Sequence, residues 1–117
     1  MGKISTVGIV GSGIMGAGLA EVAARSGFDV VVRSRTQAGA DAVLQGLDAG
    51  LTKQVARERL TDDERQAILA RISVTDDLQA LSDCDLVIES IVEDMATKRE
   101  LFEQLDRIVK ADAIIAT

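Results

Sequence analysis

A glycine-rich hexapeptide near the N-terminus constrains the fold more than any other feature of this sequence. It has the spacing GxGxxG and consists of Gly11, Ser12, Gly13, Ile14, Met15 and Gly16. A β-branched run precedes it, and apolar residues at helical spacing follow it. Gly11 permits a tight turn, Gly13 lets the backbone approach a pyrophosphate, and Gly16 lets the helix pack closely on the strand. The N-terminus of that helix adds free N–H groups and a partial positive charge. The motif therefore predicts dinucleotide binding, the alternative being a packing turn without a ligand.

Segments with strand and helix patterns alternate along the whole chain. β-Branched or apolar runs predict strands at residues 3–10, 28–33, 72–75, 86–90 and 113–116. Apolar periodicity, with a capping box at Thr61 and Glu64, predicts helical segments at residues 14–27, 37–59, 61–69, 78–81 and 95–109. This alternation predicts an α/β fold, a Rossmann-type doubly wound parallel sheet with strand order 3-2-1-4-5. We expect a ligand in the crevice between the first and fourth strands. Since residues 1–117 end on the fifth strand, we expect an incomplete nucleotide domain.

Composition excludes several other classes of protein. The net charge is −6, which argues against a nucleic-acid partner. No stretch of 18 apolar residues exists, so we expect no membrane association and a cytoplasmic location. Histidine is absent, which removes the usual general base and the usual metal ligand. The one cysteine, Cys84, is expected to be a small buried residue before a strand.

The end of the second predicted strand departs from the usual dinucleotide-binding pattern. An Asp or Glu is expected there, about 20 residues after the glycine motif, to bind the adenosine ribose. This sequence has Arg33, Ser34 and Arg35 instead. Two arginines and a hydroxyl suit a 2′-phosphate, so they favour NADP(H) as the cofactor, with NAD(H) still possible. The alternatives are a solvated basic loop, or only one arginine reaching the phosphate because strand residues alternate sides.

A later segment brings in a family resemblance. Residues 85–106, DLVIESIVEDMATKRELFEQLD, contain Glu93, Lys98 five residues on, and then Leu101 and Phe102. This segment and the glycine turn resemble the 3-hydroxyacyl-CoA dehydrogenases, most of all the bacterial 3-hydroxybutyryl-CoA dehydrogenases, mycobacterial ones included. The resemblance implies that Glu93 and Lys98 lie beside the ribose and nicotinamide; the alternative is a solvated pair. That family usually has Asp at the position of Ser34, so the departure concerns the choice between NAD and NADP and leaves the implied reaction class unchanged.

The resemblance also implies what the rest of such an enzyme does. Its members transfer hydride between NAD(P)(H) and a 3-hydroxyacyl-CoA, using a His–Glu pair with a Ser and an Asn that would come after Thr117. We therefore expect no catalytic residue in this chain, and no activity from it alone. The full-length protein is expected to carry a C-terminal helical domain and to form a homodimer. A weaker match places Lys53 and Arg57 against acyl-CoA phosphates, unless they are a solvated helix face.

Two other functions fit parts of the pattern. β-Hydroxyacid dehydrogenases have a similar glycine turn and a similar motif after the second strand. Their segment between the second and third strands is short, whereas residues 35–71 here contain two predicted helices. A non-catalytic NAD(P)-sensing domain has the same turn and length but has no need of Glu93 and Lys98. The acyl-CoA enzymes therefore remain the preferred interpretation.

Overall fold

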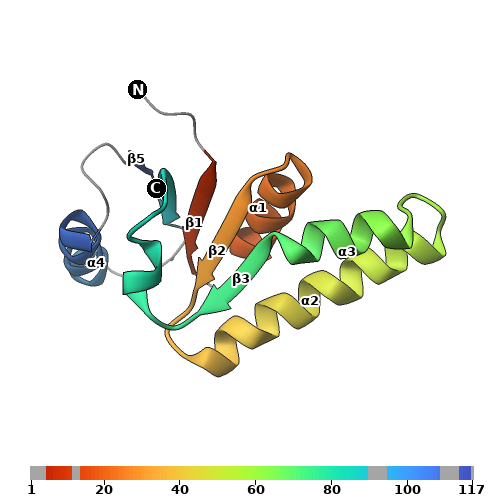
Figure 1. Cartoon of the computed structure of the whole chain (residues 1–117). Helices are drawn as coiled ribbons and strands as arrows, with labels where there is room; N and C mark the ends of the chain where they lie inside the picture. The colour runs from red at the N-terminus through yellow and green to blue at the C-terminus, as the bar shows by residue number, and fades with distance from the viewer. Residues whose placement is uncertain (1–4, 12–13, 90–94, 109–113, 117) are drawn as a thin grey trace.

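The computed structural model describes residues 5–11, 14–89, 95–108 and 114–116. The elements in chain order are β1 (Thr6–Val10), α1 (Ile14–Arg25), β2 (Asp29–Arg33), α2 (Gln37–Ala56), α3 (Asp62–Ala70), β3 (Ile72–Thr75), the short 3₁₀ helix η1 (Leu78–Leu81), β4 (Leu86–Glu89), α4 (Met95–Ile108) and β5 (Ile114–Ala116). The strands form one parallel sheet in the order β3-β2-β1-β4-β5 (Figure 1). The predicted order 3-2-1-4 is confirmed, and β5 pairs with β4 at the edge.

The sheet register places the ends of three strands side by side. Val10, the last residue of β1, pairs with Arg33 at the end of β2 and with Glu89 at the end of β4. The chain leaves β1 toward α1 on one face and later returns to β4 on the other side of β1, so the strand order reverses here. Ligands of open α/β sheets bind outside the carboxyl ends of the strands at such a reversal.

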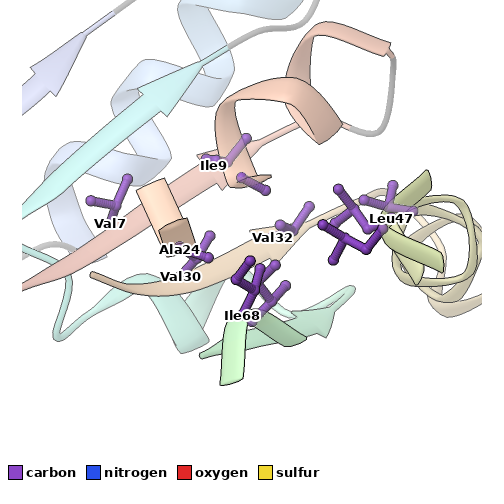
Figure 2. Close-up of a cluster of buried hydrophobic side chains, with 11 residues drawn as sticks. Val7, Ile9, Ala24, Val30, Val32, Leu47 and Ile68 are labelled. Carbon is purple, nitrogen blue, oxygen red and sulfur yellow. The ribbon is translucent and has the colours of Figure 1, made fainter. Parts of the chain in front are cut away.

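Three helices cover one face of the sheet and bury the larger core. Alternate residues of β1 and β2 point into it, because successive strand side chains face opposite sides. Figure 2 shows Val32 of β2 between Leu47 of α2 and Ile68 of α3, and Ile9 of β1 in the same cluster. The buried residues of this core are Val7, Ile9, Ala20, Ala24, Val30, Val32, Val43, Leu47, Leu51, Ile68 and Ile72.

A smaller core lies on the opposite face, under η1 and α4. It contains Val10, Leu81, Cys84, Val87 and Leu101. In Figure 1, α4 lies on the side of β1 away from α1, α2 and α3. Cys84 is fully buried here, as the sequence predicted. The connection between β3 and β4 contains only η1 and no long helix. This short element therefore lies close over β1 and β4 on this face of the sheet.

The long helical hairpin between β2 and β3 begins and ends at recognisable caps. The Thr36 side chain caps α2, and the predicted capping box of α3 is confirmed, with reciprocal bonds between Thr61 and Glu64. The sequence predicted that the first of these helices ends at about Arg59, whereas α2 ends three residues earlier, at Ala56. Glu58 adopts a left-handed φ of 58°, which reverses the chain and closes the helix end with two backbone bonds.

The start of β2 also differs slightly from the prediction. Gly27 ends α1 in a left-handed conformation, with a φ of 97°, as expected for a helix-terminating glycine. The amide of Phe28 then bonds back to Ala23 in this cap, so β2 starts at Asp29 rather than at residue 28. Within the described ranges, β1 starts at Thr6, since Ser5 lies outside the strand.

No helix in the described ranges is long and apolar enough to cross a membrane.

Candidate nucleotide-binding site

The turn after β1 has the geometry that the glycine motif predicted, as far as the structure describes it. Gly11 is buried and has a φ of 135°, a conformation that only glycine adopts readily. Its amide donates to the carbonyl oxygen of Arg33 at 3.0 Å, which ties the turn to the end of β2. Helix α1 opens at Ile14, so the motif residues Ile14, Met15 and Gly16 form its first turn. Ser12 and Gly13 lie outside the described residues.

Arg33, which ends β2, and the two residues that follow it have different environments. The Nε atom of Arg33 donates to the carbonyl oxygen of Asp76 at 3.1 Å, which holds the turn after β3. Ser34 is only 5% exposed, whereas Arg35 is exposed. The alternation expected from the sequence is therefore present: Arg33 reaches toward β3, while Ser34 packs against α2. Arg33 is thus bonded to the chain after β3, and Arg35 is the more exposed of the two arginines.

Helix α2 approaches the end of β2 more closely than the sequence indicated. A Cβ built on Gly39 would lie 2.8 Å from Ser34 Oγ and 3.1 Å from Thr36 Oγ1. The sequence interpretation did not include Gly39 or Thr36 in the site. The available signal was the pattern Thr-x-x-Gly directly after a strand, since threonine favours the helix N-cap and glycine permits close packing.

Glu89 is a second residue of this edge that sequence reasoning missed. It ends β4, pairs in register with Val10 and is only 2% exposed. With Ser34, it is one of two buried polar or charged residues among those that the structure describes. The two lie on either side of the end of β1. The sequence signal was a glutamate at the end of an otherwise apolar strand. Burying a charge is costly, so a charged residue in a buried strand indicates a specific role.

The structure does not place the other predicted site residues at this edge of the sheet. Lys53 and Arg57 are exposed at the far end of α2, and Lys53 lies about 24 Å along the helix from Gln37. Only an extended ligand could contact both regions. Glu93 lies outside the described residues. Lys98 belongs to α4 by its backbone, and its side chain is outside the description.

Hollows that the described residues form elsewhere have a structural explanation. The larger one, about 370 Å³, lies between the ends of α1 and α3 and includes Arg25, Glu64 and Arg71. Arg71 donates to the carbonyl oxygen of Ala24 at 2.8 Å, and Arg25 bonds to the side chain of Gln54. Arg71 therefore neutralises the negative C-terminal end of α1, and Arg25, in the last turn of the same helix, is held by Gln54, so both arginines have structural roles.

The resolved pKa shifts among the described groups also arise from helix caps and ion pairs. The backbone amide of Thr61 lowers the pKa of Glu64. A hydrogen bond from Arg65 lowers the pKa of Asp62, and the same contact raises the pKa of Arg65. All of these groups lie in the α2–α3 hairpin, away from the glycine turn. They therefore report local capping and not acid–base chemistry.

Fold and site together define the class of protein. A parallel sheet with the order β3-β2-β1-β4, and a positive-φ glycine between β1 and α1, is a Rossmann-type nucleotide-binding fold. Residues 6–117 match the family described as "3-hydroxyacyl-CoA dehydrogenase, NAD binding domain". The chain belongs to this family of NAD-binding domains, as the resemblance predicted.

Individual relatives agree with that assignment. The chain is 46% identical over 110 residues to a probable 3-hydroxybutyryl-CoA dehydrogenase of Deinococcus radiodurans, covering 94% of this chain and 39% of the relative. It is 43% identical over 115 residues to the 3-hydroxybutyryl-CoA dehydrogenase of Mycobacterium tuberculosis, covering 97% and 40%. The crystal structure of M. tuberculosis FadB2 superposes with a TM-score of 0.93 at 41% identity, covering 98% of this chain and 41% of that one. The chain thus spans about two fifths of the length of these relatives.

Proposed function

We propose that residues 1–117 are the nucleotide-binding domain of an enzyme that transfers hydride between NAD(P)(H) and a 3-hydroxyacyl-CoA or 3-oxoacyl-CoA. The observation that carries this proposal is the glycine turn at the strand-order reversal, in a chain 46% identical to a probable 3-hydroxybutyryl-CoA dehydrogenase. The residues present fit a dinucleotide, since Gly11 has the left-handed backbone that this turn requires and α1 begins directly after it. When bound, the nicotinamide supplies the hydride acceptor or donor.

The roles of individual residues follow from their positions. The backbone from Gly11 to Gly16, with the first turn of α1, binds the pyrophosphate through N–H groups and the helix dipole. Glu93 and Lys98 are proposed to contact the ribose and the nicotinamide, by the family resemblance. Lys53 and Arg57 are proposed to meet phosphates of the acyl-CoA.

Nucleotide binding can be tested on this chain directly. The sequence has no tryptophan or tyrosine, so the fluorescence of NADH can be followed without a protein signal. We expect Gly13→Asp to abolish NADH binding, because a carboxylate would meet the pyrophosphate. Gly18→Asp is the matched control: Gly18 is exposed on α1, and a Cβ there meets nothing within 4 Å. Equal loss in both variants, or no NADH binding by the wild-type chain, would contradict the proposed function.

Catalysis is proposed to need groups that this chain does not contain. The chain has no histidine, and the family resemblance assigns the proton transfer from the 3-hydroxyl to a His–Glu pair. We therefore expect NADH binding without oxidation of NADH by acetoacetyl-CoA, measured by absorbance. Turnover by this chain would contradict that division of roles. For the full-length protein we propose a homodimer in the cytoplasm.

NADP(H) is proposed as the preferred cofactor. Arg35 is exposed beyond the end of β2, and the carboxylate that would repel a 2′-phosphate is replaced by Ser34. Arg35→Ala should weaken NADP(H) binding by about 1.5–3 kcal/mol, the contribution of a hydrogen bond to a charged group, and leave NAD(H) binding unchanged. Isothermal calorimetry with both cofactors measures the difference. Equal affinity for the two cofactors in the wild-type chain would refute the preference and leave NAD(H) as the cofactor.

A further inference from the structure

Glu89 is a buried charged residue to which the proposed function assigns no role. It is 2% exposed, and it is the last residue of β4. Burying a carboxylate costs free energy unless other groups hold it. Glu89 does have an interaction partner, and no fully buried side-chain oxygen or nitrogen in the described part of the chain lacks one. The protein therefore holds this side chain in place, but packing alone does not explain why a charged residue ends the strand.

The sheet places Glu89 at the edge where the cofactor would lie. Glu89 pairs in register with Val10, and Gly11 of the glycine turn follows directly after Val10. Burial alternates along β4, so Glu89 shares its face of the sheet with Val87, which belongs to the smaller core under η1 and α4. Glu89 therefore lies at the strand-order reversal, on the face of the sheet that α4 covers.

The topology also decides which half of a dinucleotide this carboxylate would approach. In this fold the cofactor extends across the strand-order reversal, and its adenosine ribose lies at the end of β2. The strand order β3-β2-β1-β4-β5 puts β4 on the opposite side of β1 from β2. The nicotinamide half of the cofactor therefore belongs on the side of Glu89. Glu93, which is proposed to contact that half, follows four residues later in the chain.

The two redox states of the cofactor differ in charge at this end. The nicotinamide ring carries a positive charge when it is oxidised and none when it is reduced, while the adenosine and the pyrophosphate stay the same. A carboxylate nearby attracts only the oxidised ring, and salt screens a buried carboxylate less than an exposed one. Opposite charges about 10–15 Å apart, at an effective dielectric constant of about 20, attract enough to change a dissociation constant about tenfold, before solvent in the crevice weakens the effect.

We infer that the buried Glu89 carboxylate, at the end of β4 beside the glycine turn, favours binding of the oxidised cofactor relative to the reduced one. The inference rests on the proposed nucleotide-binding function and extends it to the redox state of the ligand. Glu89 acts through its charge and does not contact the reacting atoms. It is therefore a specificity-determining residue and not a catalytic residue.

The test compares the dissociation constants of NAD+ and NADH, measured by isothermal calorimetry on this chain and its variants. The same ratio is taken with NADP+ and NADPH. Glu89→Gln keeps the size of the side chain and one oxygen but removes the charge. We expect it to raise the ratio of the oxidised to the reduced dissociation constant about three- to tenfold. Glu89→Met, a second uncharged variant of similar length, should raise the ratio in the same direction.

Two control variants separate the charge from other effects. Glu89→Asp retains the negative charge and should keep the ratio close to that of the wild-type chain. Glu103→Gln removes the same charge from an exposed position on α4 and should leave the ratio unchanged. A ratio that Glu89→Asp changes as much as Glu89→Gln would overturn the inference, because the charge would not be the cause.

ADP-ribose, which lacks the nicotinamide, guards against a simple folding defect. Both constants in the ratio come from one protein sample, so a smaller folded fraction lowers the amount of ligand bound and leaves the ratio unchanged. If Glu89→Gln weakens ADP-ribose, NAD+ and NADH equally, Glu89 has a structural role and the inference is wrong.

Failure of this inference and failure of the proposed function give different results. If the wild-type chain binds both redox states and Glu89→Gln leaves their ratio unchanged, the inference fails while nucleotide binding stands. If the wild-type chain binds neither redox state, and no ADP-ribose, the proposed function fails and the inference fails with it.

Discussion

Gly8→Ala offers the sharpest test of how the second face of the sheet is packed. Gly8 lies in the middle of β1 and faces the smaller core. A Cβ there would lie 2.8 Å from Leu81 Cδ2, 2.9 Å from Cys84 Sγ and 3.4 Å from Val87 Cγ2. All three of these residues are fully buried, so none of them can move into solvent. The close approach of η1 to the sheet thus depends on the missing side chain.

The expected loss of stability follows from two opposing effects. Overpacking a filled core costs about 1–3 kcal/mol. Replacing glycine by alanine in a strand stabilises the folded state by about 0.5–1 kcal/mol, because the unfolded chain becomes less flexible. The difference is a loss of about 0–2.5 kcal/mol in the free energy of unfolding, and we expect the upper part of that range, about 1–2.5 kcal/mol, because the Cβ of Gly8→Ala would lie under 3.0 Å from two buried side chains. Such a loss lowers the melting temperature of a domain this size by about 4–8 °C or more.

Urea unfolding followed by far-ultraviolet circular dichroism measures the effect, since the chain lacks tryptophan and tyrosine for intrinsic fluorescence. Gly46→Ala is the control, and it should stabilise by about 0.5–1 kcal/mol, because a Cβ there meets nothing in α2. Cys84→Ala should partly rescue Gly8→Ala by removing one of the two closest contacts. A gain of stability in Gly8→Ala equal to that of Gly46→Ala, or strict additivity with Cys84→Ala, would refute the reasoning.

Other predictions concern the helix ends and the start of the sheet. Glu58→Gly should raise stability by about 1 kcal/mol, because the left-handed conformation at residue 58 penalises any side chain; an unchanged or lower urea midpoint would contradict this. Asp85→Ala should lose about 1–3 kcal/mol, since Asp85 Oδ2 accepts from the amides of Ser5 and Thr6 and from the Ser5 hydroxyl, and hydrogen exchange at Thr6 should accelerate. The capping contact that lowers the pKa of Glu64 should stabilise α3 fully above the ordinary pKa of a glutamate, and this stability should disappear as the pH falls through the lowered value. Glu64→Gln should flatten that part of the pH profile of unfolding, and an unaltered profile would count against it.

Local signals in the sequence predicted most of the elements. The capping box of α3 depends on groups three residues apart, and the left-handed end of α1 depends on one glycine. The order of the first four strands followed from the alternation of elements and the right-handed crossover rule. Boundaries were less certain: α2 ends at Ala56 because a glutamate, rather than a glycine, adopts the reversing conformation. Sequence patterns rarely assign that role to glutamate.

The candidate site divides in the same way. Sequence spacing identified the glycine turn and the unusual Arg33-Ser34-Arg35 segment. It included the alternative that only one arginine reaches the phosphate but did not decide which one, because the bond from Arg33 to the Asp76 carbonyl joins residues 43 positions apart. Nor did it show that Glu89 is buried beside the end of β1, since burial there depends on the pairing of β4 with β1 and on the covering of the second face.

By itself, the sequence determined the class of fold, the family and the type of ligand, because strand and helix periodicity, a glycine motif and helix caps all act over a few residues. The tertiary structure decided which side chains gather at the ends of β1, β2 and β4. Ser34 becomes a buried hydroxyl only when α2 folds back over the end of β2, and Gly39 permits that approach. Contacts between distant segments depend on how whole elements pack, and no local sequence pattern encodes that packing.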